Sequence, residues 1–368
     1  MIVILSTSDG MRFQDNPKYF YLYLIENSKI FSPFWATKNY NLYTDLIKEG
    51  FPAVYIYSVR HFIMMLRAHV IVCDDTVNPS FYDSLLWFLG RFNCLLTWHG
   101  TGFKNIGLLD DKYARKDYLF SRFLYFIRKK IYHKYFFIVA TSEKDRERKM
   151  LCFQNDNVFI TGSPRNVIFH NKSSDVLRKK YNLGNYDKVI LYAPTYRENS
   201  TSLTPFTEVF FTRLQAFLEA NNTLFILKKH KYDRTLEIPS DYKNIVDITE
   251  QSSDVQELLS ICDLLISDYS GIVSDYVLRE KPILFYIYDY DEYIQNCRSF
   301  SYDLLETLPG PFIYNENELL NYLKDTGWFY EKEYQARFNS FKEMFQKYSN
   351  EDPNSRLSEM LLKWYNKK

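Results

Sequence analysis

Cysteine and histidine are scarce in this 368-residue sequence, and the spacing of both excludes several kinds of site. The five cysteines lie far apart and form no C-x-x-C pair, which argues against a disulfide framework and against a zinc knuckle. The six histidines include no pair at metal-ligand spacing, so we expect no metal held by the protein. The pattern favours reduced thiols, as in the cytosol, and a site that works without a cofactor.

The sequence also lacks an excess of either charge and any long apolar run. Its 46 Lys and Arg residues balance 45 Asp and Glu residues, and the formal charge of +1 argues against nucleic acid as a partner. No window approaches the roughly 18 apolar residues that a membrane span needs. The apolar residues 1–5 follow no basic segment and are soon followed by Asp9, so we interpret them as a buried first strand rather than a signal peptide.

Three common motifs are missing as well. The first strand is not followed by G-x-G-x-x-G, and G-x-x-x-x-G-K-[ST] occurs nowhere, which excludes ordinary dinucleotide and P-loop sites. G-x-S-x-G is absent too, which excludes the usual nucleophile elbow. Any site for a nucleotide-linked ligand must therefore use other residues.

Short apolar runs alternate with longer segments of helical period along nearly the whole chain, which is typical of an α/β protein with parallel sheets covered by helices. The predicted strands fall at residues 29–35, 53–57, 69–73, 94–97, 158–161, 189–193, 223–228, 245–248, 264–267 and 283–286. The predicted helices fall at residues 40–49, 59–68, 80–91, 173–181, 204–220, 254–262 and 272–280.

The chain is longer than the roughly 250–300 residues at which a single core stops growing, so we expect two domains. The polar stretch 170–188 is the best candidate for the joint. We therefore predict an N-terminal domain over residues 1–170 and a second domain over residues 171–345. Helical periodicity near the end of the chain predicts a terminal helix, residues 346–368, that packs across the joint.

One segment, residues 112–137, interleaves eight Lys and Arg residues with large apolar side chains. A basic amphipathic helix of this kind can lie in a lipid headgroup layer, with Arg128, Lys129 and Lys130 on anionic lipid. An ordinary surface helix whose apolar stripe faces the core has the same pattern. The sequence leaves both interpretations open.

In an open parallel sheet, ligands bind beyond the carboxyl ends of the strands, so polar residues just after a strand are candidates for a site. In the first half, His99 follows a predicted strand and precedes Gly100. An imidazole at such a position suits a general base, although a histidine that only hydrogen-bonds within a turn fits equally well.

Two strand ends in the second half carry cations. Thr195 and Arg197 follow a strand that breaks at Pro194, and a guanidinium there suits bidentate phosphate binding. Lys229 and His230 lie in a cationic cluster after the next strand, which either binds an anion or is screened by water and salt.

A third strand end has the form of an anion site. A small-residue turn leads from an apolar strand into a predicted helix, whose free N–H groups and positive dipole end would face a ligand. Helix capping by Ser270 or Asp268 explains the same residues and is compatible with anion binding. The turn consists of Ser267, Asp268, Tyr269, Ser270 and Gly271.

In these stretches the sequence resembles the bacterial CDP-glycerol:poly(glycerophosphate) glycerophosphotransferase family, whose members build teichoic acid and related capsular polymers. The likeness covers roughly residues 35–311, with the family motifs in order. W-H-G-T-P-x-K corresponds to residues 98–104, G-x-P-R-N to 162–166, Y-A-P-T-x-R to 192–197, and S-D-Y-S-S to 267–271, followed by Asp275, K-P-I-x-F-Y at 281–286 and an acidic turn at 289–293.

The resemblance implies a GT-B fold, in which two Rossmann-like domains face a cleft, and a metal-independent transferase that attaches peripherally to the cytoplasmic face of the cell membrane. It implies transfer of glycerol phosphate, or a related polyol phosphate, from a CDP-polyol donor to a lipid-linked or polymeric acceptor, with release of CMP. The expected partners are therefore the CDP-activated donor, a saccharide acceptor and an anionic membrane surface.

The resemblance also implies roles for individual residues. His99 matches the proposed base for the acceptor hydroxyl, and His230 matches a histidine that assists the donor diphosphate. The implied donor-binding residues are Thr195, Arg197, Lys229, Ser267, Asp268, Ser270 and Gly271. The implied acceptor-side or supporting residues are Gly100, Thr101, Lys104 and Arg165.

Four positions depart from the family pattern: Gly102 replaces Pro, Ser163 replaces Tyr, Gly271 replaces Ser and Lys231 replaces Pro. A nucleotide-sugar glycosyltransferase on the same fold is the main alternative, because a fold does not fix the donor. Its retaining form normally shows Glu-x7-Glu, where this sequence has Asp268 and Asp275. A non-catalytic binding module for polymer or lipid is a third hypothesis.

Overall fold

The computed structural model describes all residues except 76–79, 111–118, 171–173, 198–203, 230–235, 237–241, 252–253, 297–298, 349–350 and 368. The chain divides into two compact units. The first comprises Met1–Gly100, Ile106–His170 and Met344–Lys368, and the second comprises Thr101–Asn105 and Asn171–Glu343. The five residues Thr101–Asn105 therefore belong to the second unit, although they were predicted to lie in the first domain.

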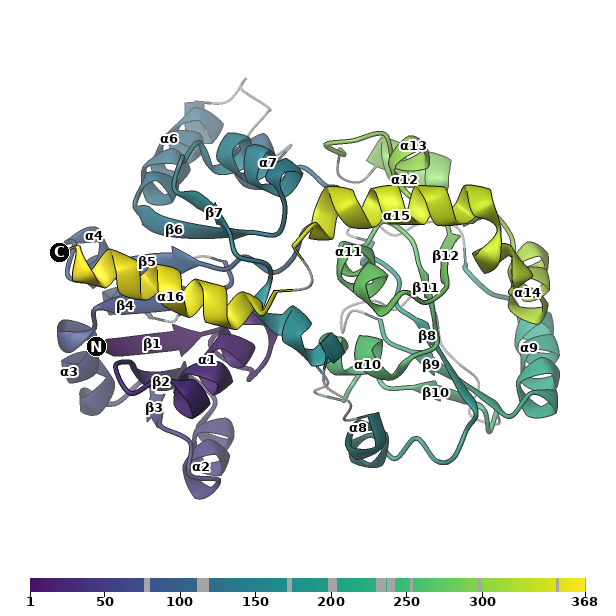
Figure 1. Cartoon of the computed structure of the whole chain (residues 1–368), viewed down its shortest axis with the longest axis horizontal. Coiled ribbons are helices and arrows are strands. Elements are labelled where there is room, and N and C mark those ends of the chain that lie inside the picture. Colours follow the sequence, from purple (N-terminus) through teal and green to yellow (C-terminus); the bar gives the residue numbers. More distant parts are fainter. Residues whose placement is uncertain are drawn as a thin grey trace. The chain divides into compact units, whose positions relative to one another are not determined.

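In its described part, the first unit holds a seven-stranded parallel sheet in the order β3-β2-β1-β4-β5-β6-β7 (Figure 1). The strands are β1 (Ile2–Ser6), β2 (Ser32–Thr37), β3 (Ala53–Tyr55), β4 (Val70–Cys73), β5 (Asn93–Leu96), β6 (Tyr135–Ala140) and β7 (Val158–Ile160). The helices are α1 (Asp15–Asn27), α2 (Tyr40–Lys48), α3 (Val59–Arg67), α4 (Phe81–Phe88), η1 (Gly107–Leu109), α6 (Leu119–His133), α7 (Glu143–Phe153), η2 (Pro164–His170) and α16 (Pro353–Asn366).

The second unit holds a six-stranded parallel sheet in the order β10-β9-β8-β11-β12-β13. Its strands are β8 (Lys188–Tyr192), β9 (Thr223–Leu227), β10 (Ile245–Asp247), β11 (Leu264–Ser267), β12 (Ile283–Tyr286) and β13 (Phe312–Ile313). Its helices are α8 (Ser174–Lys180), α9 (Glu208–Ala220), α10 (Val255–Ile261), α11 (Ile272–Tyr276), η3 (Val277–Arg279), α12 (Tyr290–Asn296), α13 (Leu304–Thr307), α14 (Glu316–Lys324) and η4 (Gly327–Tyr330), and α15 (Lys332–Gln346) begins in it.

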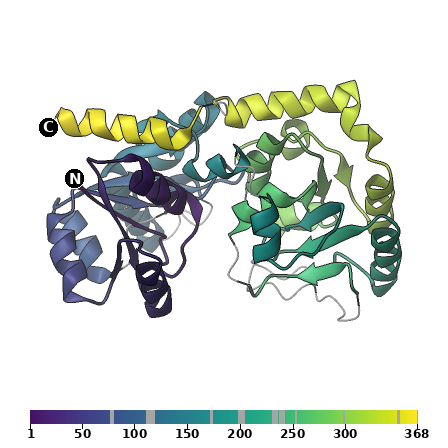
Figure 2. The ribbon, with the colours of Figure 1, turned by 60° about the horizontal axis from the view of Figure 1, so that its bottom comes forward.

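Strand alternation builds the core of the first unit. Because side chains of a strand point to opposite faces in turn, Val3 and Leu5 pack into one apolar layer, while Ile4 packs into the other. Leu357 and Leu361 of α16 join the layer of Val3 and Leu5, so the last helix covers that face of the sheet (Figure 2). The end of the chain thus completes the core of the first unit.

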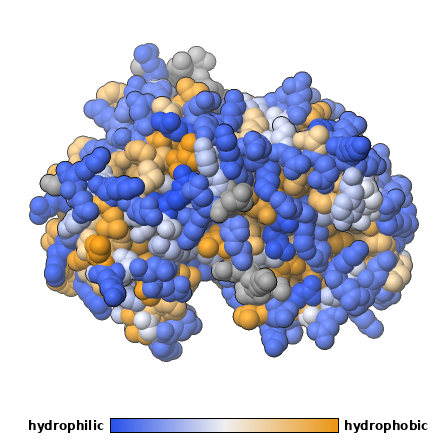
Figure 3. Space-filling view, in the orientation of Figure 1, coloured by the Kyte–Doolittle hydropathy of each residue, from blue (hydrophilic) through white to orange (hydrophobic). Residues whose placement is uncertain are grey.

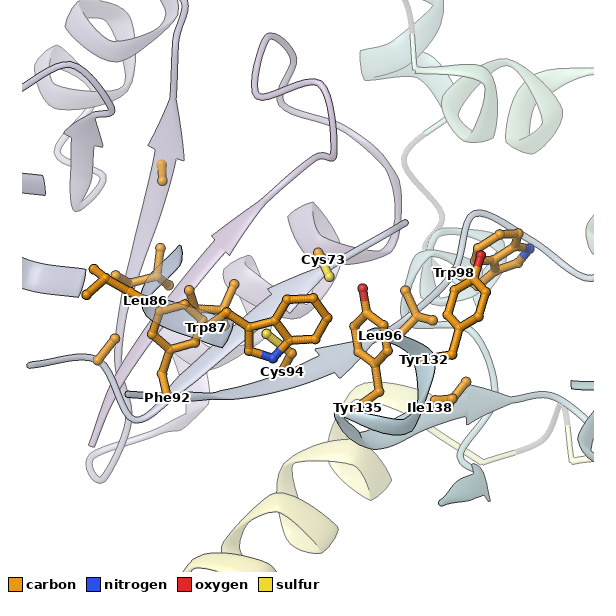
Figure 4. Close-up of a cluster of buried hydrophobic side chains, with 14 of the residues drawn as sticks. Cys73, Leu86, Trp87, Phe92, Cys94, Leu96, Trp98, Tyr132, Tyr135 and Ile138 are labelled. Atoms are coloured by element: carbon orange, nitrogen blue, oxygen red, sulfur yellow. The ribbon is translucent and has the colours of Figure 1, made fainter. Parts of the chain in front are cut away.

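The opposite layer contains Cys73 and Cys94 between large aromatic side chains (Figure 4). Both thiols are buried and free, as are those of Cys152 and Cys262, while Cys297 lies outside the described residues. Burial raises the pKa of the Cys73 and Cys94 thiols well above the ordinary value, which keeps them protonated and unreactive.

One predicted helix is shorter than the sequence pattern suggested. The basic amphipathic segment was expected to run to residue 137, but α6 ends at His133 and Tyr135 begins strand β6. Lys134 is the single residue between them, and its N–H donates to the Ile131 carbonyl. Residues 112–118 of that segment lie outside the described part of the chain.

The surface of the protein mixes charged and apolar residues. On the face drawn in Figure 3, hydrophilic side chains dominate and apolar ones come to the surface in separate patches. None of the described helices combines the length and the apolar character that a membrane span requires.

Candidate active site

Polar residues gather at the carboxyl edge of the second sheet, where the strand order reverses between β8 and β11. Thr195 lies just beyond β8 and Asp268 just beyond β11. The Thr195 N–H donates to both carboxylate oxygens of Asp268, at 2.9 and 3.1 Å, and so ties the two strand ends together. This switch point is where open α/β sheets bind their ligands.

Arg197 is buried at this edge between two carboxylates. Its Nε and one terminal nitrogen contact Asp289 at 2.7 and 3.0 Å, and its other terminal nitrogen lies 2.8 Å from Asp268. Burial alone would lower the pKa of Arg197, but the charge of Asp268, with the bonds to Asp289, outweighs burial and raises it. Arg197 was predicted to bind a donor phosphate, whereas in the structure its charge has two carboxylate partners.

The two serine hydroxyls of the small-residue turn after β11 form hydrogen bonds with main-chain groups. The Ser267 hydroxyl donates to the Ala193 carbonyl at 2.8 Å, which links β11 to β8. The Ser270 hydroxyl accepts from the Ile272 N–H at 3.5 Å, a long contact at the start of the five-residue helix α11. A Cβ atom at Gly271 would lie 3.2 Å from the Thr101 carbonyl oxygen, so the chain passes closely over this turn.

A small, open hollow lies beside the switch point. The Thr195 side chain lines it and is only 9% exposed, and in the described part of the chain its hydroxyl has no hydrogen-bond partner. Lys229 also lines the hollow, and its ammonium group donates to the Leu236 carbonyl and lies 3.7 Å from Asp247. His230, the predicted partner of the donor diphosphate, lies outside the described residues.

The first unit presents His99 at the carboxyl edge of its own sheet, three residues beyond the end of β5. The His99 side chain is exposed, and its ring stacks on the buried Trp98 ring with centroids 4.4 Å apart. Trp98 lies at one end of the apolar cluster in Figure 4, where its ring also meets Phe153 at 5.0 Å. The imidazole is therefore accessible on one side and supported by a rigid core on the other.

Arg165 holds the turn that contains His99 in place through its guanidinium. Its guanidinium donates to the His99 carbonyl at 3.1 Å and to Asp15 at 2.8 Å. Gly100 has a φ of +134°, and a Cβ atom there would lie 2.7 Å from the Arg165 guanidinium. Glycine is required at this position because the Arg165 guanidinium fills the space that a side chain would need.

Thr101 and Lys104 follow His99 in the chain but belong to the second unit. The Ser274 hydroxyl of α11 donates to the Thr101 carbonyl. Lys104 pairs with Phe300 in an isolated bridge, and its ammonium group lies 5.4 Å from the Tyr293 ring. The W-H-G-T stretch is thus held by different units on its two sides.

Sequence reasoning missed a carboxylate at the switch point of the first sheet, between β1 and β4. Asp74 directly follows β4, is 7% exposed, and accepts from the Ser8 N–H at 2.7 Å. Burial and then the charge of Asp15 raise the pKa of Asp74 to about 7. An acidic residue immediately after a buried strand was the available signal, since the same signal marked Asp268 in the second unit.

The described part of α6 carries its apolar side chains outward. Phe123, Phe126 and Ile127 are 59%, 53% and 36% exposed, and the Lys130 ammonium lies 4.4 Å from the Phe126 ring centroid. Lys130 is exposed, whereas Arg128 and Lys129 are partly buried. Much of the apolar surface of α6 therefore does not face the core, which weakens the interpretation as an ordinary surface helix.

Two other helices that pack on the same side of the sheet, α3 and α4, also expose apolar side chains. On α3, Val59, Phe62, Ile63 and Leu66 are all at least 40% exposed, and they recur at the spacing of one helix face. On α4, Phe88 is 67% exposed, and its ring lies 4.2 Å from the Lys134 ammonium just after α6. We call these residues of α3, α4 and α6 the apolar face.

No group of three or more metal-ligating side chains with suitable geometry occurs among the described residues.

Each unit is an open, parallel α/β sheet with polar residues at its switch point, the class of fold that binds nucleotide-linked ligands beyond its strand ends. The structure of the wall teichoic acid polymerase TagF has the same fold, with a TM-score of 0.82 and 22% identity over 100% of this chain and 89% of that chain. The family model of CDP-Glycerol:Poly(glycerophosphate) glycerophosphotransferase matches residues 1–363. The chain belongs to this family, whose members are enzymes.

Curated relatives include several teichoic acid enzymes. The chain is 26% identical over 337 residues to the teichoic acid glycerol-phosphate transferase of Staphylococcus aureus, covering 88% of this chain and 83% of the relative. It is 31% identical over 272 residues to the teichoic acid glycerol-phosphate primase of Bacillus spizizenii, covering 71% and 67%. Its match to the teichoic acid poly(ribitol-phosphate) polymerase of Bacillus spizizenii, 31% identical over 213 residues, covers 55% of this chain but only 34% of that longer protein.

Proposed function

We propose that this protein transfers glycerol phosphate, or a related polyol phosphate, from a CDP-activated donor to a hydroxyl group of a lipid-linked or polymeric acceptor, in the synthesis of teichoic acid or a capsular polymer. The observation that carries the proposal is the family match over residues 1–363. Relatives named for glycerol-phosphate transfer, which align over most of this chain, support glycerol phosphate as the transferred group.

The donor would bind at the switch point of the second unit. The Thr195 hydroxyl is a buried donor that faces a hollow and needs a partner, and a phosphate oxygen would satisfy it. Lys229 and His230 would add positive charge, which offsets the charge that develops on the leaving diphosphate oxygens. Arg197 would act through Asp268 and Asp289, by fixing the strand ends that carry Thr195.

The reaction would proceed by attack of the acceptor oxygen on the β-phosphorus of the donor. His99 would take the proton of the acceptor hydroxyl as the new oxygen–phosphorus bond forms. The bond between the β-phosphorus and the bridging oxygen would break, and CMP would leave with that oxygen. The exposed position of the His99 ring suits contact with a large acceptor.

A donor panel tests this function. We expect CMP release from CDP-glycerol or CDP-ribitol in the presence of a lipid-linked acceptor, and at least about a 100-fold slower release by His99→Ala and by His230→Ala, as is typical for loss of a general base or a phosphate-binding cation. Separation of nucleotides by liquid chromatography measures it. Release of UDP from UDP-sugars would favour a glycosyltransferase, and ligand binding without turnover would favour a binding module.

We further propose that the protein is peripheral on the cytoplasmic face of the cell membrane and contacts anionic lipid through α6. The exposed apolar side chains would enter the acyl boundary, while Arg128, Lys129 and Lys130 would meet the headgroups. The remaining residues of the apolar face, on α3 and α4, would enlarge this contact beyond the segment that the sequence indicated.

Liposome sedimentation tests the membrane contact. We expect the triple variant Phe62→Ser, Phe88→Ser, Phe126→Ser to lose at least about tenfold in affinity for vesicles with phosphatidylglycerol, since it removes three apolar side chains that would enter the acyl boundary. The triple reversal Arg128→Glu, Lys129→Glu, Lys130→Glu should lose at least as much, since it replaces three cations that would meet anionic headgroups. The control replaces Val176, Val209 and Tyr330 with Ser, because these apolar residues of the second unit are also exposed, by 66–79%. Equal affinity of wild type and both triple variants would contradict the proposal.

A further inference from the structure

The turn that carries His99 has an unusual backbone. Trp98 adopts a left-handed conformation with a φ of +57°, which is rare for a bulky side chain and persists only when the surroundings enforce it. This conformation sets where the indole lies, and the His99 ring stacks on that indole. Whatever holds the Trp98 peptide therefore also determines where the imidazole is presented.

Asn16 holds that peptide. Its side chain is completely buried, and its amide N–H donates to the Trp98 carbonyl at 2.7 Å. The amide oxygen of the same side chain accepts from the Arg165 N–H at 3.1 Å. One amide thus joins the turn after β5 to the start of η2, and both its donor and its acceptor sides are used.

Arg165 completes the arrangement, because its guanidinium binds the carbonyl of the next residue, His99. Successive carbonyls of the turn are therefore bound by Asn16 and Arg165, which are themselves hydrogen-bonded to each other. Asp15, next to Asn16, pairs with the Arg165 guanidinium at 2.8 Å. Removing a single member leaves buried polar groups without partners.

We infer that Asn16 is a positioning residue for His99. It acts through the Trp98 carbonyl and the Arg165 main chain, and it touches neither donor nor acceptor. The inference rests on the proposed role of His99 as the base, and it predicts that loss of the Asn16 amide slows the reaction without weakening donor binding.

Two substitutions distinguish the hydrogen-bond donor of the Asn16 amide from its acceptor. Asn16→Ala removes both hydrogen bonds, whereas Asn16→Asp keeps the acceptor for the Arg165 N–H and loses the donor to the Trp98 carbonyl. We expect kcat to fall about 100-fold in each, because a displacement of the reacting group by about 1 Å costs that much. KM for the CDP-polyol donor should stay within about threefold of the wild-type value, since donor contacts are unaltered.

Asn155→Ala is the matched control. Asn155 is a buried asparagine of the same unit, and its amide also donates to main-chain carbonyls, those of Tyr132 and Tyr135 at 2.6 and 2.9 Å. Its replacement should cost a similar amount of stability and leave kcat nearly unchanged. A fall in kcat as large as that of Asn16→Ala would assign the effect to general destabilisation and overturn the inference.

A measurement that does not depend on activity keeps the inference distinct from the proposed function. The stacked indole shifts the His99 ring-proton resonances, which are assigned by their loss in His99→Gln among only six histidines. We expect these resonances to move toward random-coil positions in Asn16→Ala and Asn16→Asp and to stay in Asn155→Ala. Unmoved resonances in both Asn16 variants would refute the inference, whether or not the wild type releases CMP.

Discussion

Replacing Arg197 with methionine should destabilise the second unit by about 3–5 kcal/mol, the usual cost of removing one partner from a buried ion pair. Methionine fills a similar volume, so little of this effect would come from a cavity. The cost arises because Asp268 and Asp289, which are 1% exposed, would keep their charges with no guanidinium between them. Chemical denaturation followed by circular dichroism measures the change.

Two further variants show whether buried charge is the cause. Arg213→Met removes an exposed arginine of the same unit and should change stability by no more than about 0.5 kcal/mol. Adding Asp268→Asn and Asp289→Asn to Arg197→Met should recover part of the lost stability, because amides need no counter-charge. If the triple variant were less stable than Arg197→Met alone, uncompensated charge would not explain the effect.

The same network explains why the sequence alone predicted a phosphate, and not the two carboxylates, as the partner of Arg197. A guanidinium after a strand fits a phosphate or a carboxylate equally well, and Asp289, the carboxylate that binds it, lies 92 positions further along the chain. Local patterns carry no information on such pairs. Asn16 escaped notice for the same reason, since its partner Trp98 lies 82 positions away.

Strands and helices with a clear pattern and clear ends were predicted about equally well, and α2, α3, α8 and α10 fall within one residue of their expected places. Buried parallel strands are short apolar runs with clear ends, so the strands from β8 to β12 fall within a residue or two of their expected places. β6 was missed because its apolar run directly continues the aromatic and basic run of α6, with only Lys134 between them. α1 was missed because Pro17 and its many aromatic residues obscure the helical period.

A carboxyl group with a raised pKa makes stability depend on pH, and Asp74 provides the clearest case. Its pKa is about 7 in the folded protein, against 3.8 as the ordinary value, so between these two the native state holds a proton that the unfolded chain has lost. Stability should therefore fall as pH rises from about 4 to about 8. The upper limit of this loss is roughly 4 kcal/mol.

Asp74→Asn should abolish most of this dependence. The amide oxygen can still accept from the Ser8 N–H, as the carboxylate does at 2.7 Å, but it carries no charge toward Asp15. We expect the variant to be more stable than the wild type at pH 8, by as much as a few kcal/mol, and similar to it at pH 4. Thermal unfolding across this range measures both.

Asp45→Asn is the control, because the Asp45 side chain is 63% exposed in the same unit and should leave the pH profile unchanged. Parallel profiles of the wild type and Asp74→Asn would show that Asp74 titrates as an ordinary surface carboxyl. A flatter profile for Asp74→Asn than for the wild type would instead mean that Asp74, at the switch point of the first sheet, holds a proton near neutral pH. Asp15, whose charge raises the pKa of Asp74, also pairs with the Arg165 guanidinium that binds the His99 carbonyl. The proton on Asp74 would therefore be linked, through Asp15 and Arg165, to the turn that carries the proposed base.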